Sequence, residues 1–129
     1  MEILHKELTN QVIGAYYKVY NKLGYGFLEK VYENAMCIEL NKSNIEYKKQ
    51  HPIRVFYDEK NVGCYYADLF IEDILIVEIK AMVALREEHE YQLMNYLKAT
   101  DVELGLLLNF GKKAEFRRKI FMNDRKKSA

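Results

Sequence analysis

The sequence has little of what marks a specialised class of protein. Its 129 residues contain 1 proline, 6 glycines, 2 cysteines and no tryptophan. So little proline and glycine, with no repeat or low-complexity segment, is typical of an ordinary globular chain. Cys37 and Cys64 lie in apolar surroundings without metal-ligand spacing, so we expect both to be buried free thiols in a reducing compartment.

Long hydrophobic runs are also missing, and so is a large excess of either charge. No apolar stretch approaches the length of a membrane span, and residues 1–10 (MEILHKELTN) lack the basic-then-apolar layout of a signal peptide. We therefore expect a cytoplasmic protein without a membrane partner. A net charge of +1 excludes a polycation, while the length and the 50% hydrophobic content predict one domain with a substantial core.

The charge that is present is distributed unevenly. Residues 112–127 hold eight basic side chains against two acidic ones, Glu115 and Asp124. Such a local patch can attract a phosphate backbone even when the total charge is near zero. The alternative interpretation is a charged edge strand followed by a solvated tail.

The most informative stretch is residues 66–80 (YADLFIEDILIVEIK). It reads as two apolar strands that fold back on each other, interrupted by Asp68, Glu78 and Lys80. Charges inside a buried hairpin cost several kcal/mol unless they are paired or bind a metal. Because strand residues two apart share a face, Glu78 and Lys80 point the same way. For Asp68 to face them, opposed residues must sum to an even number, which predicts an odd loop or a bulge.

Four motifs resemble those of the PD-(D/E)XK nuclease superfamily, and they follow one another along the chain in the order found in that superfamily. The central one is Asp68 followed after nine residues by Glu78, Ile79 and Lys80. Residues 26–32 (GFLEKVY) are similar to the G-x-x-E-x-x-Y signature of one small branch, the GxxExxY family. Residues 89–97 (HEYQLMNYL) resemble the helical Q-x-x-x-Y element, and residues 106–111 (LLLNFG) resemble the late strand.

The sequence pattern predicts a single domain with a mixed sheet flanked by helices, of the α/β (α+β) class. Expected helices span residues 8–23, 28–42 and 87–100, and expected strands span 46–57, 62–71, 74–80, 103–110 and 116–122. Thr9 is the expected N-cap of the first helix, and Pro52 favours an edge position or a bend for its strand. The middle of this order is the restriction-endonuclease-like αβββαβ core that the resemblance implies.

The resemblance also implies a role for each candidate site residue. Asp68, Glu78 and the backbone carbonyl of Ile79 would hold a divalent cation, with Glu29 from the second helix pointing at the same site. Lys80 would orient the attacking water or stabilise the developing charge, and Gln92 would bind a ligand or a water. Without the resemblance, Glu29 would be read as complementing its helix dipole, Glu78 as an ion pair with Lys80, and Gln92 as a helix-surface side chain.

Together these features favour a Mg²⁺- or Mn²⁺-dependent nuclease that hydrolyses phosphodiester bonds, with DNA as the expected partner. The sequence shows no helix-turn-helix and no zinc finger, so this domain is not expected to read a base sequence. By analogy with small domains of this type, a homodimer is expected. The alternative is a nucleic-acid-binding or assembly module that retains the fold without catalysis. A purely structural protein, with the charges as a salt-bridge network, is the third hypothesis.

Overall fold

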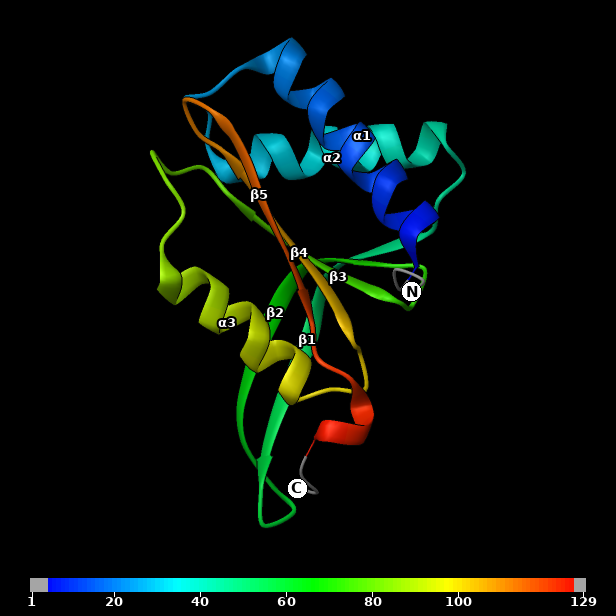
Figure 1. Ribbon diagram of the computed structural model, residues 1–129, viewed down its shortest axis with the longest axis vertical. Coiled ribbons are helices and arrows are strands. Elements are labelled where there is room, and N and C mark those ends of the chain that lie inside the picture. The colour runs from blue at the N-terminus through cyan, green and yellow to red at the C-terminus, as the bar shows by residue number, and fades with distance from the viewer. Residues whose placement is uncertain (1–4, 127–129) are drawn as a thin grey trace.

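The computed structural model describes residues 5–126 and contains one five-stranded sheet with three α-helices and a terminal 3-10 helix (Figure 1). The strands are ordered β1-β2-β3-β4-β5 across the sheet. The elements are α1 (Lys6–Leu23), α2 (Glu29–Lys42), β1 (Tyr47–Tyr57), β2 (Lys60–Ile71), β3 (Leu75–Lys80), α3 (Glu87–Lys98), β4 (Leu104–Phe110), β5 (Ala114–Ile120) and η1 (Asn123–Arg125).

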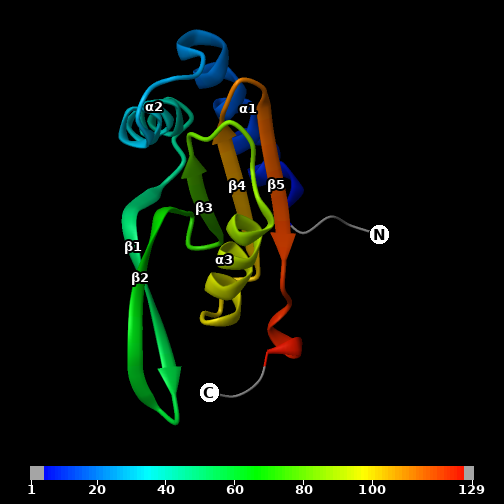
Figure 2. The same cartoon turned by 90° about the vertical axis from the view of Figure 1, so that its left-hand side faces the viewer.

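The sheet is mixed, as the sequence predicted. Only β3 and β4 are parallel, and the other neighbours are antiparallel. In Figure 2, β3 and β4 run upward and β5 runs downward. A parallel pair needs a long crossover, and α3 provides it. The predicted α+β architecture with helices flanking a mixed sheet is therefore confirmed.

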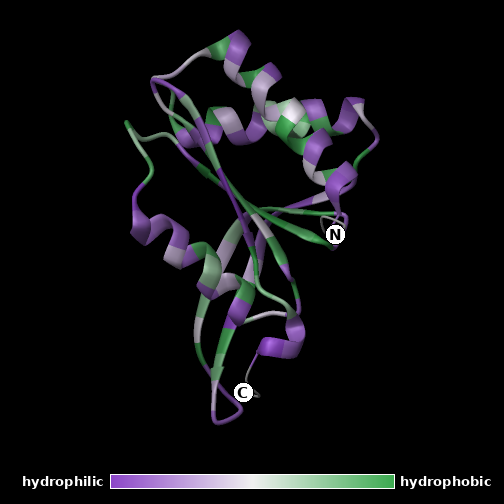
Figure 3. Cartoon of the chain, in the orientation of Figure 1, coloured by the Kyte–Doolittle hydropathy of each residue, from purple (hydrophilic) through white to green (hydrophobic). Residues whose placement is uncertain are grey.

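Two hydrophobic clusters hold the layers together, one on each face of the sheet. Alternate residues of β3 and β4, including Val77, Ile79 and Leu106, pack against α1 and α2. The opposite face, with Phe70, Ile76 and Leu107, packs against α3. Because both faces are covered, β3 and β4 read as nearly continuous hydrophobic strands, and Figure 3 shows β3 in the hydrophobic colour along most of its length.

The start of α1 differs from the prediction. The helix begins at Lys6, with His5 at the N-cap position, so Thr9 is an interior residue rather than the cap. The Thr9 hydroxyl donates to the carbonyl of His5 at 3.0 Å, a bond that threonine can form inside a helix. The helix ends as expected at Gly24, whose φ of 68° suits glycine.

The outer parts of β1 and β2, residues 51–67, continue past the rest of the sheet as a two-stranded arm (Figure 2). β1 is an edge strand, which confirms the position inferred from Pro52. The arm turns at Asp58 and Glu59, both at positive φ, so β2 begins two residues earlier than expected. Cys37 is buried, but Cys64 lies exposed on the arm, because the arm has left the core; its predicted burial was wrong.

None of the helices in the described part of the chain is long and apolar enough to cross a membrane.

Candidate active site

The β2–β3 hairpin has the register that a shared carboxylate site requires. Leu69 pairs with Val77 and Ile71 with Leu75, so opposed residues sum to an even number and three residues form the loop. The pairing of β2 with β3 ends at Leu69, and the alternation of β2 is interrupted here, since Ala67 and Phe70 both pack on the α3 face. The Asp68 carboxylate nevertheless lies within hydrogen-bonding reach of Glu78. The predicted odd loop is confirmed.

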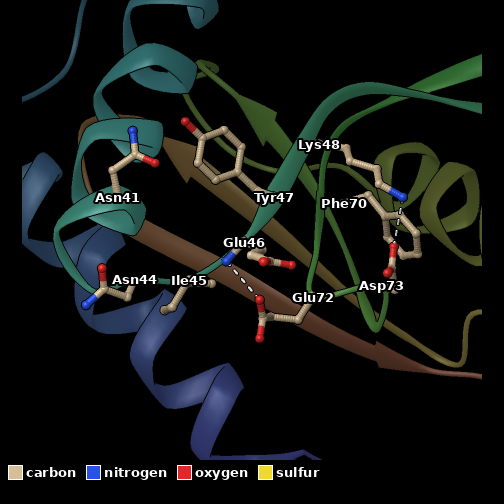
Figure 4. A pocket seen from close by; sticks show the side chains of 9 residues that line it. All are labelled: Asn41, Asn44, Ile45, Glu46, Tyr47, Lys48, Phe70, Glu72 and Asp73. Carbon is tan, nitrogen blue, oxygen red and sulfur yellow. Dashed lines mark hydrogen bonds and ion pairs between the residues drawn. The ribbon is translucent and has the colours of Figure 1, made fainter.

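The loop is fixed by its own backbone and by contacts with Glu46 and Lys48, which line an open pocket beside it (Figure 4). Glu72 and Asp73 both have a φ of 54°, and the Ile74 amide donates to the Ile71 carbonyl at 2.9 Å. The Glu72 carboxylate accepts from the Glu46 amide at 2.8 Å, and Asp73 pairs with Lys48 at 3.0 Å. These carboxylates are therefore engaged in holding the turn, and the pocket contains none of the candidate catalytic residues.

Asp68 lies where the pairing of β2 with β3 stops. Its Oδ2 accepts a hydrogen bond from the backbone amide of Ile79 at 2.7 Å, in the place of a strand-to-strand bond. Its Oδ1 accepts from the side-chain amide of Gln50 at 3.3 Å. Two fixed donors therefore hold the carboxylate in one orientation, half-buried beside Glu78.

Glu78 is the most perturbed group of the site. It is only 5% exposed, and burial, followed by the charge of Asp68 and a hydrogen bond with it, raises the Glu78 pKa to about 9. Lys80 opposes this rise in pKa, but burial and Asp68 outweigh it. Within residues 5–126, Glu78 Oε1 is buried without a hydrogen-bond partner. The positive charge of Lys80 is therefore too little to keep Glu78 ionised in the folded chain at neutral pH.

The loop before α2 sets the position of Glu29. Gly26 has a φ of 109°, which only glycine adopts readily. Tyr32 is fully buried and stacks on Phe110 at 4.1 Å, and its hydroxyl donates to the Gly24 carbonyl at 2.8 Å. Tyr32 thus packs and closes the loop, while Glu29 begins the helix, exposed but near enough for its charge to raise the Glu78 pKa further.

The segment after Lys80 is held in place by hydrogen bonds between Met82 and Asn109. Lys80 pairs with Asn109 in the β3–β4 register. The Asn109 side chain accepts from the Met82 amide at 3.0 Å and donates to the Met82 carbonyl at 2.9 Å. A Cβ on Gly111 would lie 2.3 Å from that carbonyl oxygen, so glycine is required there. These contacts fix the direction in which β3 ends and Lys80 emerges.

Helix α3 covers the site from the other side. Tyr96 is buried in the cluster that contains Phe70 and Ile76, and burial together with the charges of Glu78 and Asp68 raises its pKa to about 12. Gln92, one turn earlier, lines an open groove next to Tyr96. His89 Nδ1 accepts from the Arg86 amide at 3.0 Å and so caps the start of the helix.

Sequence reasoning missed Glu33 and Gln50. Glu33 has a side chain that is 5% exposed, and it contacts Lys30 at 3.2 Å, Lys49 at 3.6 Å and the Gln50 amide at 2.9 Å. Gln50 therefore bridges Glu33 and Asp68 through one amide nitrogen. Its φ of 51° is a conformation that costs a non-glycine residue about 1–2 kcal/mol.

The predicted basic segment is largely occupied by contacts within the chain. Arg117 and Lys119 share one face of β5 and both reach Glu90 of α3, at 3.9 and 2.6 Å. Lys126 donates to the carbonyls of Thr100 and Val102. These side chains connect β5 with α3 and the C-terminal segment with the loop after α3. The charged edge strand of the alternative interpretation is therefore present, but Lys126 in the tail is bonded within the chain rather than solvated.

The donor set fits a small, hard divalent cation. Within the described range, no three His, Cys, Asp or Glu side chains lie close enough together to hold a metal ion, so the carboxylate centre is the pair Asp68 and Glu78. A bound Mg²⁺ ion would nevertheless give the buried Glu78 oxygen a partner and remove the repulsion between the two adjacent carboxylates. Mg²⁺ commonly binds through one or two carboxylates and keeps several waters.

Comparison with known proteins bears on the family and the fold. The sequence model of the PD-(D/E)XK nuclease superfamily matches residues 6–119. The crystal structure of a protein designated SSO0001 is similar in fold, with a TM-score of 0.54 and 18% sequence identity over 72% of this chain. The match covers 50% of the SSO0001 chain, so this chain spans only about half its length. No curated protein matches the sequence.

Proposed function

Because the chain belongs to the PD-(D/E)XK nuclease superfamily, we propose that it is a divalent-metal-dependent nuclease whose centre is Asp68, Glu78 and Lys80. The observation that supports this most is the buried Glu78, with a pKa raised to about 9 and an oxygen without a partner beside a second carboxylate. For a purely structural protein, such a pair is a stability cost that a hydrophobic replacement would remove.

In this proposal Asp68, Glu78 and the Ile79 carbonyl hold the cation, and Glu29 adds negative charge at the mouth of the site. Bound there, Mg²⁺ or Mn²⁺ would lower the pKa of a water and neutralise the scissile phosphate. Asp68 is prepared for this role because the Ile79 and Gln50 donors fix its orientation. Glu78 would bind the cation as the carboxylate, with its proton released to solvent.

Lys80 stands two residues after Glu78 on the same face and keeps one charge close to the reacting phosphate. Its ammonium group would orient the water or stabilise charge on the phosphorane. Gln92, on α3, would hold a water or a substrate atom at the entrance of the groove.

The finer assignments are part of the same proposal. The loop geometry of Gly26, Glu29 and Tyr32 supports membership of the GxxExxY branch, since each residue has a distinct role there. We propose DNA as the substrate and a homodimer as the form that acts on two strands. A binding module without catalysis is the second candidate, and it would retain nucleic-acid affinity without metal-dependent cleavage.

Metal binding can be tested without an activity assay. Titration with Mg²⁺ or Mn²⁺ should raise the melting temperature of the wild-type chain and of the control Glu59→Gln, which changes an exposed turn residue. Glu78→Gln should remove this response, because a neutral amide is a poor ligand for a hard cation. An equal rise in Glu78→Gln would place the metal elsewhere on the chain.

Gln50 should matter through Asp68. Gln50→Gly relieves the positive φ but removes the amide that bridges Glu33 and Asp68, so stability should be unchanged or higher. The cleavage rate should fall, or the metal concentration needed for half-maximal cleavage should rise, about 10–100-fold. Gln11→Ala on the exposed face of α1 is the control. Wild-type metal dependence in Gln50→Gly would show that Gln50 does not position Asp68.

A further inference from the structure

An open groove of about 700 Å³ runs between the arm and α3. Ile53 packs against α3 and pairs directly with Tyr65 across the arm, so the odd-numbered residues up to the bulge after Val55 face α3. The arm wall and the α3 wall of the groove include Val55, Phe56, Tyr65, Tyr91, Gln92 and Tyr96. Most of the rings in this set remain exposed to solvent.

The groove lies next to the strands that carry the carboxylate site. Tyr96 lines the groove and packs in the same cluster as Phe70 and Ile76, which are two residues from Asp68 and Glu78 along their strands. The ring of Tyr65 on the arm lies 5.8 Å from the ring of Tyr96, centroid to centroid. A ligand that follows the two tyrosines into the groove therefore arrives beside the strands that carry the carboxylates.

The walls offer flat aromatic faces but almost no net charge. Phe56 is 47% exposed, Tyr65 is 51% and Tyr91 is 63%, an unusual amount of aromatic surface for one groove. The charged lining residues are Glu88 and Lys98, which balance each other. Attraction of a phosphate backbone alone would favour a basic lining, whereas stacking needs only exposed ring faces.

We propose that this groove binds an unpaired DNA strand by stacking its bases on Tyr65 and Tyr91, and leads it to the carboxylate site. The inference rests on the proposed nuclease function and narrows its substrate to DNA with single-stranded character. Bases in a duplex are stacked on one another inside the helix, so they cannot present their faces to these rings. An unpaired strand has both faces free, and every base has a face that can stack.

The test measures binding of a fluorescent oligodeoxythymidylate to the full-length chain in the presence of a chelator, which prevents cleavage. Tyr65→Ala and Tyr91→Ala should each weaken binding about tenfold. Tyr65→Phe and Tyr91→Phe should restore the affinity, because phenylalanine keeps the ring. The matched control is Tyr66→Ala, since Tyr66 is 56% exposed on the same strand but faces away from the groove.

Two further probes separate stacking from backbone contacts. A strand of the same length with abasic sites should bind the wild-type chain as weakly as the normal strand binds the Tyr65→Ala, Tyr91→Ala double variant. A duplex of the same length should bind more weakly than the single strand. Equal affinity of the alanine variants and the wild type, equal affinity of the abasic strand, or tighter binding of the duplex would overturn the proposal.

The outcome can also be separated from that of the proposed function. Metal-dependent cleavage that is unchanged in both alanine variants would reject the groove and keep the nuclease assignment. Tyrosine-dependent binding without any cleavage would keep the groove and reject catalysis. Tighter binding of the corresponding RNA would overturn the DNA assignment. A shift of the alanine variants from dimer to monomer in sedimentation, with unchanged strand affinity, would make the groove a contact between copies and reject the proposal.

Discussion

Lys80→Ala is expected to reduce metal-dependent cleavage about 10²–10³-fold, the usual cost of removing one group that stabilises charge in a transition state. Asp68→Asn is expected to lower cleavage below detection, since it removes a ligand charge. Asparagine keeps an oxygen that can accept from the Ile79 amide, so the strand geometry should survive. Initial rates on a labelled DNA substrate, at saturating Mg²⁺ and on folded protein, measure both effects.

Two controls match these changes in chemistry. Lys18→Ala removes an exposed lysine from α1, and Asp101→Asn removes an exposed carboxylate from the loop after α3. Both should cleave at the wild-type rate. Full activity of Lys80→Ala would contradict its role at the reacting phosphate, and full activity of Asp68→Asn would contradict the carboxylate centre.

Glu78→Gln is expected to stabilise the metal-free protein. The folded-state pKa of Glu78 is raised to about 9 from an ordinary value of 4.5, so folding favours the protonated form. Ionisation therefore costs stability as the pH rises from about 4.5, and the cost reaches its full value above about pH 9. At pH 7 the cost is on the order of 3 kcal/mol. Glutamine resembles the protonated acid and can donate a hydrogen bond to Asp68.

The measurement is a melting temperature in chelator at several pH values. Glu78→Gln should melt about 10 °C above the wild type near pH 7, with the difference shrinking toward pH 4.5 and widening toward pH 9. Glu59→Gln should show neither change. A destabilised Glu78→Gln variant, or a difference independent of pH, would mean that Glu78 is already ionised and paired in the folded chain.

Much of the fold could be predicted because local patterns and packing agree. The apolar runs of β3 and β4 reflect strands covered on both faces, and Gly24 marks the end of α1. The start of α1 was less predictable, because Thr9 favours caps by propensity yet also bonds to a carbonyl one turn back. The exposure of Cys64 could not be predicted, because it depends on the direction of the arm, which no local sequence pattern encodes.

The site divides in the same way. The condition that Asp68 and Glu78 share a face predicted an odd loop between their strands, which the register confirms, because hairpin register follows from loop length. The position of Glu33 near the site could have been predicted, since it lies one helical turn after Glu29 and shares a helix face with it. Gln50 was not, because its place opposite Asp68 depends on the register of the β1–β2 hairpin, whose turn contains no glycine. Whether Glu29, Gln92 and the Ile79 carbonyl act as proposed stays a prediction.

The central claim is that Asp68, Glu78 and Lys80 form a metal-dependent nuclease centre, and cleavage of single-stranded, duplex and branched DNA by the purified chain tests it most directly. Product should form with Mg²⁺ or Mn²⁺, stop on addition of chelator, and be absent with Asp68→Asn. Failure to cut any of these DNAs or the corresponding RNAs, together with no metal-induced rise in melting temperature, would contradict the account.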